Sequence, residues 1–564
     1  MANLFNSVVI RNPKRKSFNL SHFSKLSTEF GRLTPIMCEP VLPADKFRVS
    51  TTLKVRFAPM TFPVMERFKA FVHYWFVPNR LIWDNWEEFI TGGETGVEDL
   101  AHPYPVITID SNLGDSKILE SNFAPGSLFD YLGFPAKTLT SAEKSNLARN
   151  NFEFDALPFK AYQLIYDEWY RDQNLETKMD LRTDVDGNQN DNDDATDNGF
   201  VNALMSLRYR AWRKDYFTSA LPDPQRGPDV TLPMFGELDI VGSNMPVSVD
   251  KAENITDGVG ESAIHSHSSG GSLQFAQLSE NEFDNDDAVK FSGVIPKSTL
   301  ESKLAVDRDN LRMASINDLR KGFAVQRLYE LAARVGGRYA ENIFGNFGVH
   351  AGDARLQRPE YLGGSVVPVF VGDVLQTSES SENGTPLGMP AGVAGALDKT
   401  KAFTRHFTEH GWIIGILSIV PEATYLQGIP RKFLKRDRLD FAWPLLANLG
   451  EQEIQNQELY FEFGGTDANN KGTFGYTPRY AEYRFGVSGA HGDFRSTLRD
   501  FHDARIFDSR PALNSEFIKI KPTGNSTGLN RIFAVTGEQY DHLWVDLYND
   551  VFVKRKLPKY GTPI

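Results

Sequence analysis

The stretch that decides the fold is KFRVSTTLKVRFAPMTFPVMERFKAFVHYWFV, residues 46–77. Over residues 46–57, an apolar residue or a threonine occupies every second position, and arginine, lysine, serine or threonine stands between them. This period of two is typical of a β-strand with one buried and one solvated face. Residues 66–77 are mostly apolar on both faces, which predicts a central strand covered on both sides. Together the two strands predict a β-sandwich whose outer surface is itself packed against something.

The length and composition fit a large folded protein. The chain has 564 residues, 41% of them hydrophobic, and 41 phenylalanines, enough for a large core and for aromatic interfaces. Its single cysteine, Cys38, excludes an intrachain disulfide and is compatible with a reducing compartment. The N-terminus lacks the pattern of a signal peptide, and no stretch reaches the roughly 18 apolar residues of a membrane helix. We therefore expect no membrane insertion.

Positive charge gathers at the two ends of a chain whose net charge is −12. Residues 1–45 are predicted to form an extended arm, because Pro13, Pro35, Pro40 and Pro43 resist regular structure. Two interpretations of the basic ends stay open: solvated, disordered termini or contacts with a polyanion. The candidate cations are Arg11, Lys14, Arg15, Lys16, Lys554, Arg555 and Lys556.

Helices and further strands are expected in the rest of the chain. Aromatic residues at helical spacing predict an amphipathic helix over Asp155–Asp172. A second helix is predicted to begin at Ser315 and to end at Gly336-Gly337, followed by a helical piece over Arg338–Phe347. The later strand candidates are Val366–Val371, Trp412–Val420, Arg531–Val535 and Leu543–Val553.

Cations and aromatic residues alternate in SLRYRAWRKDYFTSALP, residues 206–222. This pattern can stack bases and neutralise phosphates. It can equally form a protein interface rich in arginine and aromatic residues, and we favour the interface.

Candidate metal and catalytic sites are weak. Asp184–Asp197 superficially resembles a calcium loop, but Gly187 and Ala195 stand at the wrong positions, so a solvated acidic loop is favoured. No nucleophile elbow, zinc-protease motif or cysteine pair occurs, and the P-loop-like residues 465–473 have Asn470 where glycine is needed. We expect no catalytic residue, cofactor or metal ion.

Residues 225–300 are rich in Gly, Ser, Asn and Asp. A structureless loop of this length inside a compact domain is unusual, so we predict an inserted subdomain that projects outward. Two histidines at its Ser/Gly-rich tip are weak evidence for a metal, and exposed tip residues are favoured. The tip residues are His265, Ser266 and His267.

Four segments in a fixed order resemble a known family. They are SFNLSHFSKLSTEFGRLTPI (17–36), RKDYFTSALPDPQRG (213–227), NDLRKGFAVQRLYELAARVGGRYAENIFGNFGVHAGDARLQRPEYLGGS (317–365) and FGYTPRYAEYRFGVSGAHGDFR (474–495). Together they strongly resemble the major capsid protein of the small single-stranded DNA phages of the Microviridae, in the gokushovirus branch. Residues 184–197 and 225–300 match no family pattern, which suits variable outer loops.

The resemblance implies a mainly β fold, an eight-stranded viral jelly roll with long helical and loop insertions. It divides the chain into an internal arm (1–45), the first part of the jelly roll (46–224), a protrusion (225–300), and a helical insertion with the remaining strands (301–564). It implies a T=1 icosahedral shell of identical subunits with fivefold, threefold and twofold contacts, enclosing circular single-stranded DNA. The insertion would cluster at the threefold axes.

The resemblance also implies locations and partners. The arm and the basic C-terminus would face the interior, where the seven candidate cations would contact DNA without reading its sequence. Residues 265–267 would form the host-attachment tip. Further partners would be a pilot protein, a small DNA-binding protein and a bacterial host receptor. The virion would assemble in the host cytoplasm. Two alternatives stay open: a carbohydrate-active β-sandwich enzyme, which needs paired carboxylates in a cleft, and a cellular β-sandwich binding module such as a carbohydrate-binding protein.

Overall fold

The structure is a computed structural model of the whole chain. It describes residues 14–92, 102–109, 119–143, 146, 152–189, 198–227, 240–242, 249–252, 288–291, 304–306, 316–335, 338–348, 350, 352–375, 390–522, 528–535 and 540–559. The chain divides into two compact units. Unit 1 comprises Met1–Arg226 with Glu330–Ile564, and unit 2 comprises Gly227–Tyr329.

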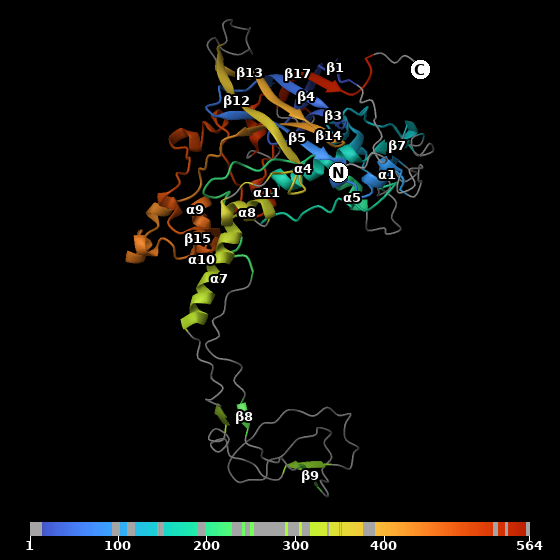
Figure 1. Cartoon of the computed structure of the whole chain (residues 1–564). Helices are drawn as coiled ribbons and strands as arrows, with labels where there is room; N and C mark the ends of the chain where they lie inside the picture. Colours follow the sequence, from blue (N-terminus) through green and yellow to red (C-terminus); the bar gives the residue numbers. More distant parts are fainter. Residues whose placement is uncertain are drawn as a thin grey trace. The chain divides into compact units, whose positions relative to one another are not determined.

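Unit 1 is built on one curled antiparallel sheet (Figure 1). Its strands lie in the order β1-β17-β4-β13-β12-β5-β14-β3, and β2 also pairs with β17. Their bounds are β1 (Lys16–Asn19), β2 (His22–Thr28), β3 (Thr34–Val41), β4 (Lys46–Phe57), β5 (Phe68–Pro78), β12 (Glu360–Leu375), β13 (Pro390–His406), β14 (Gly411–Pro421) and β17 (Leu543–Arg555).

The pairing pattern is that of a jelly roll. β1 and β2 pair with successive parts of β17, so they share one strand position, and eight positions result. One half-sheet has the order β2-β17-β4-β13 and the other β3-β14-β5-β12, and the pairing of β12 with β13 joins them. Two packed half-sheets in this order form a viral jelly roll, which confirms the predicted fold class.

The opening stretch behaves as its pattern predicts. In β4 every second side chain, from Phe47 to Phe57, is buried, and the alternate positions are solvated or half-buried. β5 lies between β12 and β14, and it is buried on both faces from Tyr74 to Pro78, whereas Lys69, Phe71 and His73 are half-buried. Its Tyr74 packs in the core between the half-sheets, whereas its Trp75 packs in a second core on the other face.

Aromatic rings fill the first core. The ring centroid of Phe30 lies 5.5 Å from that of Phe57, 5.3 Å from Phe68 and 5.9 Å from Phe533. These residues come from both half-sheets and from the insertions, so the core ties together segments more than 450 residues apart in the sequence. Stacked and edge-to-face pairs of this kind each add about 1 kcal/mol beyond area burial.

The second core corrects the predicted amphipathic helix. α4 (Leu157–Ile165) is followed by a π-helical turn, η3 (Tyr166–Tyr170), and every residue of α4 is buried. Its polar side chains are satisfied internally: Gln163 donates to the backbone carbonyls of Ala203, Leu204 and Ser206, and Lys160 Nζ donates to the carbonyl of Arg182. Because the polar face meets backbone acceptors instead of water, the helix is covered all round.

Part of the predicted arm belongs to the sheet. Residues 16–41 contain β1, β2 and β3, each paired with a neighbour. Pro35 and Pro40 lie in β3, which is the last strand in the order, and an edge strand tolerates proline because one side of it needs no backbone donor. The prediction of strand Arg531–Val535 is wrong, since a 3₁₀ turn, η11 (Leu529–Ile532), occupies it.

The other predicted strands lie within β12, β14 and β17, and the predicted helices over 315–335 and 338–347 correspond to α7 (Ile316–Val335) and α8 (Tyr339–Phe347). Between β5 and β12 unit 1 also contains η1 (Asn79–Leu81), α1 (Trp86–Thr91), β6 (Val106–Ile109), η2 (Glu120–Phe123), α2 (Leu128–Tyr131), β7 (Phe152–Asp155) and α5 (Asn198–Met205). Unit 2 contains the paired strands β8 (Ile240–Gly242) with β11 (Leu304–Val306), and β9 (Val249–Ala252) with β10 (Ala288–Phe291).

The insertion between β14 and β17 is made of short elements. They are η5 (Arg431–Phe433), η6 (Arg438–Asp440), η7 (Pro444–Leu446), β15 (Glu451–Gln455), α9 (Asn456–Leu459), α10 (Asp467–Lys471), β16 (Thr473–Pro478), η8 (Ala481–Tyr483), η9 (Gly492–Arg495), η10 (Arg499–Phe501) and α11 (Ser515–Ile518).

Candidate nucleic-acid interface

The structure brings the two basic ends of the chain together. β1 runs antiparallel to β17, so Lys16 lies opposite Arg555 and Ser17 opposite Lys554. On the other side of β17, Lys554 lies opposite Lys46 of β4. Directly opposed residues of antiparallel strands have Cβ atoms about 5 Å apart. Cations that are more than 500 residues apart in the sequence therefore meet at one end of a half-sheet.

The predicted cations differ in what they contact. Lys14, Lys16 and Lys554 are exposed. Arg15 is also exposed, and its Nη2 lies 2.8 Å from His406 Nε2. Lys556 is half-buried, and Arg11 lies outside the described residues.

Arg555 has a structural role at this end. Its Nε donates to the buried carboxylate of Asp45 at 2.8 Å, and its Nη2 donates to the carbonyl of Pro40 at 2.6 Å. The guanidinium carbon lies 5.5 Å from the centroid of the Phe47 ring. These contacts fasten the end of β17 to the connection between β3 and β4, and they hold the neighbouring cations in place.

The sequence analysis missed other cations of this interface. Lys46, Arg48, Lys54 and Arg56 occupy the solvated positions of β4, and all four are exposed. A signal for them was present, because four of the six solvated positions in residues 46–57 carry a positive charge. The alternation was used only to predict a solvated face, and the positive charge of that face was not noted.

The predicted host-attachment tip contains the histidine pair, which is, with the acidic loop, one of two weak candidates for a metal site. His265, Ser266 and His267 lie outside the described residues. Within the part of the chain that the structure describes, no three His, Cys, Asp or Glu side chains are grouped so that they could hold a metal ion. At the start of the acidic loop, Asp186 instead accepts hydrogen bonds from Trp83 Nε1 at 2.6 Å and from Asn85 at 3.0 Å, and His102 Nδ1 lies 2.7 Å from it.

The cation–aromatic segment 206–222 packs within unit 1. The guanidinium carbon of Arg210 lies 3.9 Å from the centroid of the Phe71 ring, and Nη1 donates to Ser418 Oγ at 2.9 Å. Tyr216 and Phe217 are buried in a third core cluster. Contacts within the chain thus account for much of the alternation, Arg213 and Lys214 remain exposed, and the interface with another protein stays a prediction.

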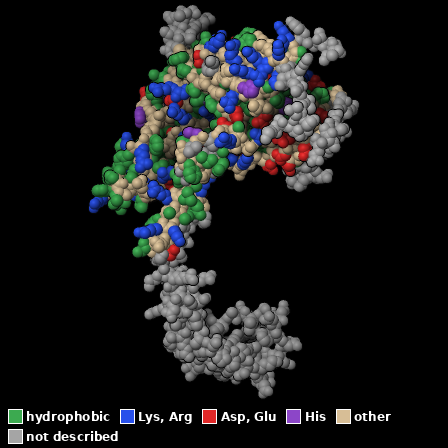
Figure 2. Space-filling view, in the orientation of Figure 1, with side chains coloured by type: hydrophobic (Ala, Val, Ile, Leu, Met, Phe, Trp, Pro, Cys, Tyr) green, Lys and Arg blue, Asp and Glu red, His purple; other side chains and the backbone are tan. Residues whose placement is uncertain are grey.

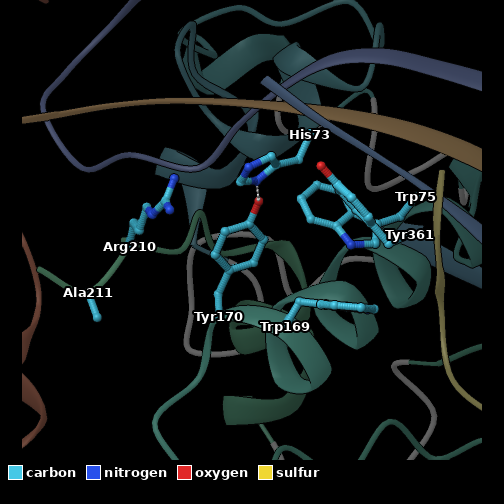
Figure 3. A pocket seen from close by; sticks show the side chains of 7 residues that line it. All are labelled: His73, Trp75, Trp169, Tyr170, Arg210, Ala211 and Tyr361. Carbon is cyan, nitrogen blue, oxygen red and sulfur yellow. Dashed lines mark hydrogen bonds between the residues drawn. The ribbon is translucent and has the colours of Figure 1, made fainter. Parts of the chain in front are cut away.

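Arg210 also lines an aromatic pocket of about 300 Å³ (Figure 3). His73 Nδ1 lies 3.0 Å from the hydroxyl of Tyr170, and the rings of Trp75, Trp169 and Tyr361 complete the wall. Burial, together with the nearby Arg210 guanidinium, lowers the pKa of His73 to about 4, so the imidazole is neutral at pH 7. Aromatic side chains and one guanidinium therefore make up most of its lining.

Among the helices of the described residues, none combines the length and the apolar character that crossing a membrane requires.

Comparisons with known proteins agree along nearly the whole chain. Residues 7–564 match the family described as "Capsid protein (F protein)". The "Capsid protein VP1" of Chlamydia phage 1 is 34% identical, over 100% of this chain and 98% of that protein. The proteins of the same name from Bdellovibrio phage phiMH2K and Spiroplasma virus 4 are 34% and 29% identical, each over 97% of this chain and 95% of the relative. With a jelly-roll sandwich and a match over residues 7–564, the chain belongs to the F-protein family of phage capsid proteins.

Proposed function

We propose that this protein is the major capsid protein of a small single-stranded DNA phage, and that its copies close into a T=1 icosahedral shell around a circular genome. Family membership and the jelly-roll sandwich support this role. A capsid protein acts by heterologous contacts between identical subunits, which close into a shell when the rotations between subunits are compatible. The role is structural and requires no catalysis.

One observation carries the DNA part of the proposal. Cations from both chain ends and from β4 gather at one end of the half-sheet β2-β17-β4-β13. A shell must hold whatever sequence its genome has, so neutralising phosphates suits it better than reading bases. We place this end toward the interior, with Arg11, Lys14, Arg15, Lys16, Lys554, Arg555 and Lys556 near DNA.

Unit 2 is assigned the outward role. It is inserted between β5 and β12 and forms a compact unit of its own. We place it at the threefold axes as a protrusion that meets the bacterial host receptor, with His265, Ser266 and His267 at its tip. A pilot protein and a small DNA-binding protein complete the virion, which assembles in the host cytoplasm.

Light scattering and electron micrographs of the purified protein test assembly. We expect pentameric species or closed particles, because obligate subunit contacts typically bury roughly 2,000 Å² or more. A monomer or small oligomer at all concentrations would contradict the proposal and would favour a carbohydrate-active or carbohydrate-binding sandwich protein.

Changing Arg11, Lys14, Arg15 and Lys16 to Gln tests the DNA contact. If all four cations meet phosphates, the slope of log affinity against log salt should fall by about 3, at about 0.7 per phosphate of single-stranded DNA. Particles of this variant should contain less DNA.

The matched control changes four exposed cations of the β14–β17 insertion to Gln: Lys432, Arg436, Arg438 and Arg484. It removes the same charge elsewhere and should leave the salt slope unchanged. Normal DNA content with an unchanged slope in the first variant would show that the arm only braces neighbouring subunits.

A further inference from the structure

One face of the half-sheet β2-β17-β4-β13 points away from the sandwich core. We call it the open face. The strand register sets its rows: Trp544 stands between Ser27 and Arg56, Asp546 between Lys25 and Lys54, and Tyr548 between Phe23 and Thr52. Alternate residues of the same strands are buried in the core, so these rows are the solvent side of the sheet.

The open face carries strong positive charge. Among the described residues of its strands, the exposed cations outnumber the carboxylates, which are those of Asp398, Asp546 and Asp550. Lysines and arginines gather over β4 and β17 in Figure 2. Because the whole chain has a net charge of −12, this concentration is local and suits a polyanionic partner. The exposed cations are Lys25, Lys46, Arg48, Lys54, Arg56, Lys399 and Lys554.

Aromatic rings run along the same face. Phe23 is 75% exposed, and its ring centroid lies 4.6 Å from that of Tyr548. Trp544 is 44% exposed. Further along β17, the guanidinium carbon of Arg48 lies 4.9 Å from the centroid of the Phe552 ring. Successive rings of β17 are four residues apart, about 13 Å along the strand.

A groove lies beside Trp544. Its volume is about 420 Å³, within the range of ligand-binding pockets. Lys25, Lys54 and Arg56 line it together with the indole and the carboxylate of Asp546, so an apolar ring and a net positive charge meet in one space. A nucleotide offers the complementary pair, a flat base and an anionic phosphate.

We infer that the open face binds single-stranded DNA, with bases stacked on Trp544 and on the Phe23–Tyr548 pair, and with phosphates on the flanking cations. This inference deepens the proposed function, on which its biological setting rests, by naming where the genome lies on the subunit. Stacking requires unpaired bases, because a duplex hides their flat surfaces. The face therefore selects single strands and tolerates any sequence.

Three probes separate stacking from charge: an oligothymidylate of about 20 nucleotides, an abasic strand with the same number of phosphates, and a duplex of the same length. The full-length protein should bind the oligothymidylate at least about tenfold more tightly than the abasic strand, and it should quench part of its tryptophan fluorescence on binding. Equal affinity for the two single strands would overturn the inference.

Single substitutions locate the site. Trp544→Leu and Tyr548→Leu should each weaken oligothymidylate binding by about fivefold or more, while abasic binding and the salt slope stay unchanged. Phe463→Leu is the matched control, because Phe463 is 94% exposed in the β14–β17 insertion and should have no effect. Circular dichroism of each variant checks that it folds.

A triple variant tests the charges. Lys25→Gln, Lys54→Gln and Arg56→Gln together should weaken binding of both single strands and lower the salt slope by about 2. If the open face instead docks a second copy of the chain, the aromatic variants change the oligomeric state in light scattering and leave oligothymidylate affinity as it is, which overturns the inference.

The inference and the proposed function fail in different ways. Wild-type particles that hold DNA, with aromatic variants that bind oligothymidylate normally, leave the capsid role standing and remove the stacking face. A wild-type protein that forms no particles, but binds oligothymidylate through Trp544 and Tyr548, would contradict the capsid role and support the stacking face.

Discussion

Asp503, in the insertion between β14 and β17, is fully buried. Its nearest cation is Arg531, whose Nη1 lies 3.6 Å from Oδ1. Burial raises the pKa of Asp503 to about 8. The Arg531 guanidinium opposes this rise, and the nearby Glu66 carboxylate adds to it. Desolvation therefore outweighs the ion pair, and the carboxyl group is mostly protonated at neutral pH.

The raised pKa of Asp503 makes stability depend on pH. Between about pH 4 and pH 8 the folded state keeps a proton that the unfolded state has lost. The free energy of unfolding should therefore fall as pH rises through this window, by up to about 1.4 kcal/mol per pH unit. Asp503→Asn should remove this slope and stabilise the protein above pH 8. Urea unfolding of the purified subunit from pH 5 to pH 9 measures both effects.

A control keeps this test specific. Asp493→Asn changes an exposed carboxylate of the same insertion and should leave the pH dependence as in the unchanged protein. Parallel pH profiles for Asp503→Asn and the unchanged protein would show that Asp503 ionises normally in the folded state.

Residue-level prediction from sequence succeeded where a local pattern decides burial. The alternation from Phe47 to Phe57 fixed which side chains of β4 enter the core. It failed at Lys160 and Gln163, because their acceptors are carbonyls about 20 and 40 residues away. Lys54 and Arg56 were visible as cations, but only the register with Trp544 and Asp546 shows that they share a face with aromatic rings.

At the scale of elements, a buried polar network connects the two half-sheets. Thr51 of β4 forms hydrogen bonds with the hydroxyl of Tyr74 in β5 and, at 3.0 Å, with Oδ1 of Asn549 in β17. Asn549 Nδ2 donates to the carbonyl of Ile36 in β3 at 3.0 Å. Two strands of each half-sheet thus share one chain of hydrogen bonds inside an apolar core.

Asn549→Leu should lower the free energy of unfolding by about 2 kcal/mol or more, because the carbonyl of Ile36 loses its partner while it stays buried. Tyr74→Phe removes one hydroxyl and leaves Thr51 bonded to Asn549, so its cost should be smaller, about 1 kcal/mol. Urea unfolding of both variants provides the comparison. A larger loss for Tyr74→Phe would mean that the hydroxyl, and not the amide, holds the network together.

Strand prediction from sequence depended on side-chain pattern and missed two kinds of strand. β3 contains prolines, which led to the prediction of an irregular arm. Proline is tolerated there because β3 is an edge strand, which the sequence does not reveal. β13 begins with small residues of low strand propensity and was not predicted. A Cβ atom at Gly392 would lie 2.6 Å from the carbonyl oxygen of Phe62, so this position has no room for a larger residue. Close backbone approach is a tertiary demand that local periodicity does not record.

At the scale of the whole molecule, the family resemblance implied the jelly roll, and the order of its strands came only from the structure. The period of two identifies strands, but it does not say that β17 lies between β2 and β4, because that pairing spans nearly the whole chain. The composition of residues 225–300 predicted an inserted subdomain, whereas the bounds of the two compact units follow from contacts in the structure. The role of that insertion as a protrusion stays a prediction.

Replacing Val249–Phe291 with a short Gly/Ser linker tests that role. These two residues are partners in the β9–β10 ladder, so the cut ends already lie side by side. The sandwich of unit 1 should keep its circular dichroism and urea midpoint, because, among the residues that the structure describes, its core clusters contain none from unit 2. Attachment of particles to host cells should be lost.

A milder variant, His265→Ala with His267→Ala, asks whether the tip itself makes the contact. It should reduce attachment and leave particle yield unchanged. Failure of the linker variant to fold would show that unit 2 is part of the folding core of the subunit.

Because β17 lies between the N-terminal strands and β4, the half-sheet β2-β17-β4-β13 can form only late in synthesis of the chain. About 500 residues separate β4 from the end of β17, so at about 5–20 residues per second the ribosome needs roughly 25–100 s to supply the missing strand. Until then β1 and β2 have no partner and one edge of β4 stays open, a template for pairing with other chains. Only a finished chain can therefore complete this half-sheet and the basic surface that β17 and β4 form together.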